Sequence, residues 1–370
     1  MTFSLSLGPE DFALDDDELG EPIAEVLTVA TRGLGSKQRA VRWLERLDDR
    51  TALAAAGSWD EPGCELALWR VSFAPADAMD ADGAASAARS VSATPHEGGC
   101  VLGIEAAPRR LYTACGGGGV CCYAVEGVEE EAPSLRLAWR QAGTPSVATL
   151  GVGWDKGSGA LCAVSEEGSL TQLDAASGMA VHAVATDELA LYAVAWSRAA
   201  AGASAQAATV SSRLMLWDVR AAGKRPVLTL LPKPHSPEAV QLQCVSSDDA
   251  RPHLLGAGSS EGSLYLWDAR YPHAPAVAME AHAADVWALQ MCSCLYGDLL
   301  SCSTDGTVQA RKWGSDSLAT MEVGEGEPEV RTLVEQELPM NDLHFWPECG
   351  YLACASDAEV LTFIAVGESK

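Results

Sequence analysis

Basic residues are scarce in this 370-residue sequence, which has 25 Lys and Arg against 51 Asp and Glu and a formal net charge of −26. A surface of this sign is repelled by phosphate backbones and anionic lipid, so we expect no direct binding to nucleic acid or to a membrane. The acidic residues concentrate at 11–25, 126–131 and 321–337. We expect these segments to be solvated loops and a tail, with a docking site for a basic partner segment as the alternative.

Long apolar runs are also missing, and none approaches the ~20 residues that a membrane-spanning helix needs. The first 22 residues contain no Lys or Arg and carry an acidic run, which is typical neither of a secretion signal nor of a transit peptide. The sequence therefore predicts a protein of the nucleus or cytoplasm.

No Cys-x-x-Cys pair occurs among the twelve cysteines. The closest approximations, Cys121-Cys122 and Cys292-Ser-Cys294, lack a second half at zinc spacing. Most of the other cysteines lie within apolar runs such as "GALCAVS" and "YLACAS", where free Cys is typically a small buried residue. We therefore expect core thiols in a reducing compartment, with no metal and no cofactor.

Catalytic motifs are absent as well. The glycine run in "ACGGGGVCCY" (114–123) lacks the Lys-Ser/Thr of a phosphate-binding loop and leads into a strand-like segment, so a tight turn explains it better. His282 and Asp285, together with Ser303 and Asp305, could be mistaken for parts of a hydrolytic triad, but no Gly-x-Ser-x-Gly elbow accompanies them. We predict that the protein is not an enzyme and has no catalytic residues.

The most prominent feature of the sequence is a repeated unit. An apolar or alternating run ending in a marker residue, followed twice by Asp-x-Arg, recurs about every 50 residues, slightly more than the ~40–45 typical of a WD repeat. The seven markers are Trp69, Tyr123, Leu173, Trp217, Trp267, Arg311 and Phe363. Because Asp follows the marker in only three copies, Asp218 and Asp268 are better explained as acceptors in strand-ending turns than as catalytic carboxylates.

Each unit contains short strand-like runs separated by Gly, Ser and Asp, and no credible long helix. The sequence therefore predicts an all-β fold, a seven-bladed WD40 β-propeller. The last unit is one strand short, and residues 24–31 belong to no preceding unit, so we expect an N-terminal strand to complete the last blade. Residues 1–23 are then an acidic, flexible tail, and residues 24–370 form the propeller.

Several residues receive structural roles from this repeat. We expect Trp69, Trp217 and Trp267 to pack between blades. In WD repeats, a His, a Ser and an Asp commonly form a hydrogen-bonded network with a Trp, and His282, Ser303 and Asp305 fit the first three positions. Arg311 stands where the Trp is expected, so we expect an incomplete network in that blade.

Longer stretches carry a more specific resemblance. The segments "AAGSWDEPGCELALWRV" (55–71), "GSLYLWDARYPHAPAVAMEAHAADVWALQ" (262–290), "LYAVAWS" and "LPMNDLHF" follow one another in the order and spacing of one family. In these segments the chain resembles the small, forty-three-kilodalton WD-repeat nucleoporin of the Y-shaped outer-ring complex. The similarity extends over roughly residues 24–366, whereas the Ala-rich insertions at 74–90 and 199–208 depart from it.

The resemblance implies a non-enzymatic scaffold subunit of the nuclear pore complex, located at the nuclear envelope and supporting protein and mRNA transport. It implies a monomeric propeller within a hetero-oligomer, attached to an α-helical solenoid nucleoporin of the short arm of the Y. Trp154 is a candidate anchor for a partner helix, because Trp is enriched at interface hot spots. Trp287 is a second candidate, although we expect it to be buried in its blade.

The two Trp-Asp-x-Arg motifs support an alternative function. They place Arg220 and Arg270 at the rim of the propeller, and this motif is associated with WD40 substrate receptors of cullin-type ubiquitin ligases. Arginines paired with nearby acidic loops would explain the same residues without a partner.

Overall fold

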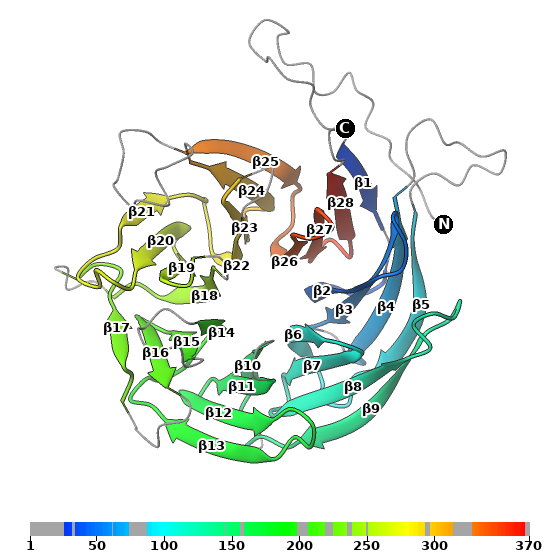
Figure 1. Ribbon diagram of the computed structural model, residues 1–370, viewed down its shortest axis with the longest axis horizontal. Coiled ribbons are helices and arrows are strands. Elements are labelled where there is room, and N and C mark those ends of the chain that lie inside the picture. The colour runs from blue at the N-terminus through cyan, green and yellow to red at the C-terminus, as the bar shows by residue number, and fades with distance from the viewer. Residues whose placement is uncertain are drawn as a thin grey trace, which may run out of the picture.

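The computed structural model describes residues 26–31, 34–60, 62–73, 87–144, 146–155, 159–197, 206–218, 225–234, 239–248, 251–292, 297–313 and 328–366. Its regular elements are all β-strands, arranged in seven antiparallel sheets of four strands around a central axis (Figure 1). None of the described residues forms a helix of the length and hydropathy needed to cross a membrane. The predicted all-β, seven-bladed propeller is confirmed.

The blades follow the chain. Blade one contains β2 (Gln38–Arg46), β3 (Thr51–Ser58), β4 (Glu65–Ser72) and β5 (Ala87–Pro95). Blade two contains β6 (Val101–Ala107), β7 (Arg110–Cys115), β8 (Val120–Glu126) and β9 (Ser134–Gln141). Blade three contains β10 (Thr149–Trp154), β11 (Ala160–Ser165), β12 (Ser169–Asp174) and β13 (Ala180–Ala185). Blade four contains β14 (Ala193–Ser197), β15 (Gln206–Val210), β16 (Leu214–Asp218) and β17 (Leu228–Leu230).

Blade five contains β18 (Leu242–Ser247), β19 (Leu254–Ser259), β20 (Ser263–Asp268) and β21 (Val277–Glu280). Blade six contains β22 (Val286–Met291), β23 (Leu299–Ser303), β24 (Thr307–Lys312) and β25 (Glu329–Glu335). Blade seven contains β26 (Met340–Trp346), β27 (Tyr351–Ser356), β28 (Leu361–Val366) and, as its outermost strand, β1 (Val26–Ala30).

The ring is closed by strand β1. It pairs antiparallel with β28, in a register that runs from Val26 opposite Val366 to Ala30 opposite Thr362. This pairing joins the two ends of the described chain within one sheet and covers the edge that β28 would otherwise leave open. The predicted N-terminal clasp is confirmed.

Burial explains why the second strand of each blade is a continuous run of small and apolar residues. Every residue of β19 and β27 is buried, whereas the outermost strands β13 and β25 are largely exposed. A middle strand is covered on both sides because each blade is stacked between two neighbours. The core accordingly consists of seven apolar clusters, one at each contact between adjacent blades.

Glycines set the closest approaches between blades. A Cβ atom on Gly57 would lie 2.4 Å from Cγ1 of Val101 in the next blade, and one on Gly258 would lie 2.5 Å from Cγ1 of Val286. Both positions are in second strands, and only a residue without a side chain lets the inner strand of the next blade pack at this distance.

The marker residues fall on the seven third strands, which confirms the repeat, with one correction in the last blade. Ladder pairing places Ile364, opposite Leu352, where the other blades have their marker. Ile364 packs toward blade six, as a marker packs toward its preceding blade, whereas Phe363 faces the opposite way and packs against Trp43 of blade one. Ile364 also follows the last residue of its second strand, Ser356, by eight positions, as Trp267 follows Ser259.

The acidic segments are more structured than expected in two places. Residues 329–335, part of a predicted loop, form the outer strand β25. Around 126–131, Glu126, Glu129 and Glu131 form ion pairs with Arg136, Arg109 and Arg89. Their charge is therefore partly balanced within the chain. The predicted tail at 1–23 lies outside the described residues.

Candidate functional site

The strand order sorts the predicted site residues onto two opposite faces of the ring. The first and third strands of each blade run in the same direction, so their C-terminal ends lie on one face. This face, here called the WD-turn face, carries Trp154, Asp218 and the Asp268–Arg270 turn. The opposite face, here called the histidine face, carries His282 and Asp305. Arg220 lies outside the described residues.

The turn after β20 is held by its own carboxylate. Asp268, which is 2% exposed, accepts the Arg270 backbone N–H at 2.9 Å and the Arg270 guanidinium at 2.9 and 2.5 Å. Burial alone would raise the pKa of Asp268, but the hydrogen bonds from Arg270 outweigh it and hold the pKa below its usual value. Arg270 also lies 5.8 Å from the ring of Tyr271. Asp268 thus has the geometry of a turn acceptor, and Arg270 is its partner.

The marker tryptophans lie between blades. Trp69, Trp217 and Trp267 are 8%, 4% and 0% exposed. Trp217 donates its indole N–H to the Thr209 hydroxyl at 2.9 Å, and Trp267 stacks on Tyr265. Asp218 ends β16 opposite Gln206. These positions are those of packing residues and strand ends.

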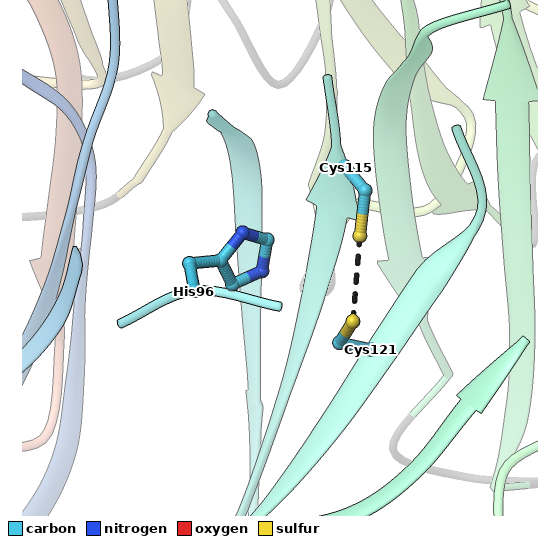
Figure 2. A group of neighbouring side chains, drawn as sticks. All are labelled: His96, Cys115 and Cys121. Carbon is cyan, nitrogen blue, oxygen red and sulfur yellow. Dashed lines mark hydrogen bonds between the residues drawn. The ribbon is translucent and has the colours of Figure 1, made fainter. Parts of the chain in front are cut away.

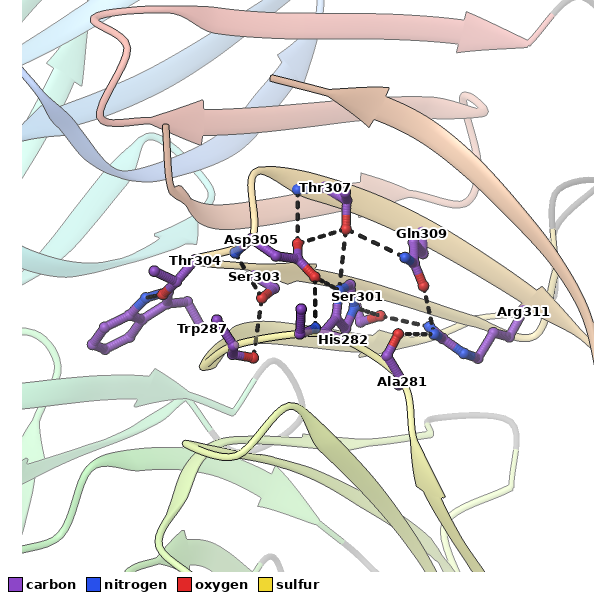
Figure 3. A network of polar contacts seen from close by, with 12 residues as sticks. Ala281, His282, Trp287, Ser301, Ser303, Thr304, Asp305, Thr307, Gln309 and Arg311 are labelled. Atoms are coloured by element: carbon purple, nitrogen blue, oxygen red, sulfur yellow. Dashed lines mark hydrogen bonds and ion pairs between the residues drawn. The ribbon is translucent and has the colours of Figure 1, made fainter. Parts of the chain in front are cut away.

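The network around His282 differs from the predicted one in its serine (Figure 3). The imidazole contacts Asp305 through Nδ1 at 3.0 Å and the hydroxyl of Ser301, rather than Ser303, through Nε2 at 2.8 Å. Ser303 instead donates to the carbonyl of Ala284 and accepts the backbone N–H of Asp305. The placement of Ser303 against the imidazole was wrong, because Ser301, two residues earlier in β23, lies opposite the ring while Ser303 caps the turn that follows the strand.

The expected gap in this network is filled by Arg311. Its guanidinium donates to the Ser301 hydroxyl at 3.0 Å and to the carbonyl of Ala281 at 2.8 Å. Burial lowers the pKa of His282 despite Asp305, so the ring is neutral at pH 7. Arg311 therefore takes the position and the donor role of the missing Trp, and the network is complete.

The innermost strands enclose a channel of about 1380 Å³. On its wall Arg42 contacts Asp342 at 2.5 Å across the seam between blades one and seven, and Glu105 of blade two at 3.8 Å. His344 accepts the Trp43 backbone N–H through Nδ1, and burial together with the charge of Arg42 lowers its pKa to about 3. The channel wall thus has a charged cluster on three successive blades.

Burial raises the pKa of Glu105 to about 7, with Arg42 opposing the shift and Asp342 adding to it. A carboxyl group whose pKa is raised by folding stabilises the fold below its unfolded pKa of ~4.3, and that contribution is lost as the pH rises through about 7. We expect Glu105→Gln to be neutral at pH 4 and to raise the free energy of unfolding at pH 8 by roughly 1–3 kcal/mol. Urea titrations at both pH values measure this difference.

Glu131→Gln is the control, because Glu131 is 86% exposed and its 3.7 Å ion pair with Arg89 lies at the surface, where such pairs contribute little. It should change stability equally at the two pH values. The same result for Glu105→Gln would show that the channel carboxyl group does not titrate in this range.

The two candidate anchor tryptophans both line the channel and are both half-buried. Trp287 donates its indole N–H to the Thr304 hydroxyl at 2.7 Å and lies under the guanidinium of Arg39 at 4.6 Å, so it is less enclosed than expected. Trp154 lies at the end of β10, on the WD-turn face. Of the two, Trp154 is on the same face as Arg270.

One group of possible metal ligands was missed by motif spacing. His96, Cys115 and Cys121 come from three segments of blade two, and their ligand atoms lie within 4.8 Å of one another (Figure 2). Sγ of Cys115 is 3.6 Å from Sγ of Cys121. The Cys115 thiol donates a hydrogen bond to the Cys121 sulfur, which lowers the pKa of Cys121 to about 5 although burial opposes the shift. The same hydrogen bond raises the pKa of Cys115.

Comparison with known proteins identifies relatives. No family model matches the chain. Nucleoporin Nup43 of Homo sapiens is 24% identical over 271 residues, which are 69% of this chain and 67% of that protein. Nucleoporin Nup43 of Mus musculus is 24% identical over 272 residues, 70% of this chain and 68% of that protein. The chain is related to the Nup43 nucleoporins.

A third relative, the nuclear pore complex protein nup43 of Dictyostelium discoideum, is 30% identical over 105 residues, 28% of this chain and 24% of that protein. The resemblance drawn from the sequence is thereby confirmed, and the names of all three relatives agree with the predicted nuclear pore localisation. Nucleoporin relatives and a propeller fold suggest a structural, non-enzymatic protein.

Proposed function

We propose that this protein is a scaffold subunit of the outer ring of the nuclear pore complex, the Y complex, and that it supports nucleocytoplasmic transport by binding an α-helical solenoid nucleoporin. The similarity to Nup43 nucleoporins over 69% of the chain is the observation that carries the proposal. The fold supports it, since a ring closed by β1 is a rigid disc whose connections project from two faces.

The WD-turn face is the docking surface in this proposal. Exposed apolar side chains follow the third strands of three successive blades: Met179 is 70% exposed, Val227 53% and Tyr271 71%. Trp154 opens onto the same face. Tyr and Trp are favoured at interface hot spots, and scattered apolar residues alone would need no explanation. With a net charge of −26, the chain favours a partner helix that has apolar residues flanked by Lys or Arg.

The alternative, a cullin-ligase substrate receptor, gains no specific support. The Arg270 side chain is 51% exposed, and Asp268 holds it through three contacts within its own turn, so the position of Arg270 is explained without an adaptor. Arg220 lies outside the described residues. The alternative is therefore an outcome of the test below.

Affinity purification of the tagged protein from gently lysed cells, with quantitative mass spectrometry, tests the proposal. Outer-ring nucleoporins are expected to co-elute at about one-to-one, and the tagged protein is expected at the nuclear rim. Co-elution of a cullin and its adaptor instead, lost in an Arg220→Ala/Arg270→Ala variant, would overturn the scaffold function in favour of the ligase receptor. Recovery of neither set would also refute it.

A further inference from the structure

Blade two repeats the architecture of the His282 network with different chemistry. Thr113 pairs with Cys121 in the ladder as Ser301 pairs with Gln309, and Cys115 follows Thr113 by two residues as Ser303 follows Ser301. The imidazole Nε2 is 2.8 Å from a hydroxyl oxygen in both blades. The positions of Ser303 and Gln309 in blade six are therefore taken by Cys115 and Cys121 in blade two.

The carboxylate partner of the histidine is also replaced. In blade six Asp305 contacts Nδ1 of His282, whereas in blade two Nδ1 of His96 contacts the backbone carbonyl of Gly99 at 2.6 Å. A carbonyl only accepts, so Nδ1 carries the proton and Nε2 presents its lone pair. Metal-binding histidines are commonly oriented in this way, with the other ring N–H donated to a backbone carbonyl.

We propose that Nε2 of His96 and the thiolates of Cys115 and Cys121 bind one Zn²⁺ ion. Tetrahedral Zn–S bonds of ~2.3 Å separate two sulfur ligands by about 3.8 Å. The observed Sγ–Sγ separation is 3.6 Å, and all three ligand atoms lie within 4.8 Å of one another. The separation of the two sulfur ligands therefore already matches tetrahedral coordination, and the imidazole lies beside them.

Binding is balanced by loss of the two thiol protons to solvent as the Zn–S bonds form. The Thr113 hydroxyl, which now faces Nε2, has a second acceptor in the carbonyl of Cys121 at 3.5 Å. The ligands are 6%, 0% and 0% exposed for His96, Cys115 and Cys121. A closed set of soft and imidazole ligands favours Zn²⁺ or Cu⁺ over Mg²⁺ or Ca²⁺.

The site would fasten the segment before β6 to the β7–β8 hairpin. Cys115 and Cys121 belong to the apolar cluster between blades one and two, which also includes Leu53 and Leu66. The role is structural, and it is independent of the nuclear pore proposal. The fourth tetrahedral position is left to a water molecule or to Cys100, whose carbonyl accepts the N–H of Gly116 beside Cys115 and whose thiol, now 3.3 Å from Sγ of Cys64, would have to turn toward the site.

The test is the metal content of the purified, reduced full-length protein by inductively coupled plasma mass spectrometry. The expected result is about one Zn per chain, and a Co²⁺-substituted sample should show thiolate-to-cobalt charge-transfer absorption. The Cys115→Ser/Cys121→Ser variant should lose the metal, whereas Cys162→Ser, at a buried cysteine of blade three, should keep it. Cys100→Ser tests the fourth ligand by its effect on the cobalt spectrum.

Less than about 0.1 metal per wild-type chain, with no charge-transfer band after Co²⁺ addition, would overturn the proposal. Stoichiometric Cu⁺ would overturn the choice of ion. If the double variant does not fold, the wild-type protein still decides the question, because a chelator should lower its melting temperature only if the metal is bound.

Discussion

Replacing Asp342 with Ala is expected to lower the free energy of unfolding by about 3–5 kcal/mol, because it removes the closest carboxylate of a largely buried arginine. Asp342 Oδ2 accepts the backbone N–H of Val41 at 2.9 Å and the Arg42 guanidinium at 2.5 Å. The Asp342 and Arg42 side chains are only 11% and 19% exposed. The contact joins blade seven to blade one, where the ring closes.

Denaturant titration of the full-length chain measures the effect. Glu329→Ala is the control, because Glu329 pairs with Arg331 on the outer strand of blade six with both side chains more than half exposed. An exposed pair of this kind contributes about 0–1 kcal/mol. The Arg42→Ala/Asp342→Ala double variant should lose less than the sum of the single losses. Equal losses for Asp342→Ala and Glu329→Ala would show that the seam contact does not stabilise the ring.

The fold could be predicted from the sequence because each structural signal is local and repeated seven times. The second strands read as short runs of small apolar residues such as "YLACAS", and their burial between two blades requires that composition. The closing strand could also be predicted, since counting strands left residues 24–31 over and the last blade incomplete. Both arguments rest on pattern alone.

The side-chain contacts of the site could not be predicted in the same way. Ser301 and Ser303 are two residues apart in one strand, and only the fold shows which of them contacts His282. Arg311 was predicted to break the network, but a long guanidinium side chain reaches the Ser301 hydroxyl from the Trp position. Side-chain length and donor geometry decide such contacts, and the repeat spacing contains neither.

The same limit explains the missed cluster in blade two. His96 is nineteen positions before Cys115 in the sequence, and Cys121 follows across a hairpin, so no zinc-finger spacing links them. Strand pairing brings Cys121 opposite Thr113, and Thr113 is in contact with His96. A comparison of aligned blades, rather than a search for motifs, would have revealed the substitution of sulfur for oxygen.

The combined change Met179→Glu/Tyr271→Glu is expected to weaken binding of the helical nucleoporin partner by at least about 30-fold, that is by ~2 kcal/mol or more, as for the loss of interface hot spots. The two side chains are 70% and 71% exposed, so the folded monomer should retain its melting temperature. Because the partner is expected to be basic, the new negative charges should not repel it. The loss therefore reports removal of apolar contact area.

Titration calorimetry with the partner identified by affinity purification measures the change. Leu189→Glu is the matched control, because Leu189 is 93% exposed in the connection between β13 and β14, on the histidine face. If docking uses the WD-turn face, only the Met179/Tyr271 variant loses affinity. Loss with Leu189→Glu alone would move the docking surface to the histidine face, where the zinc site of blade two also lies. Loss with neither variant would show that Met179 and Tyr271 do not contribute to docking.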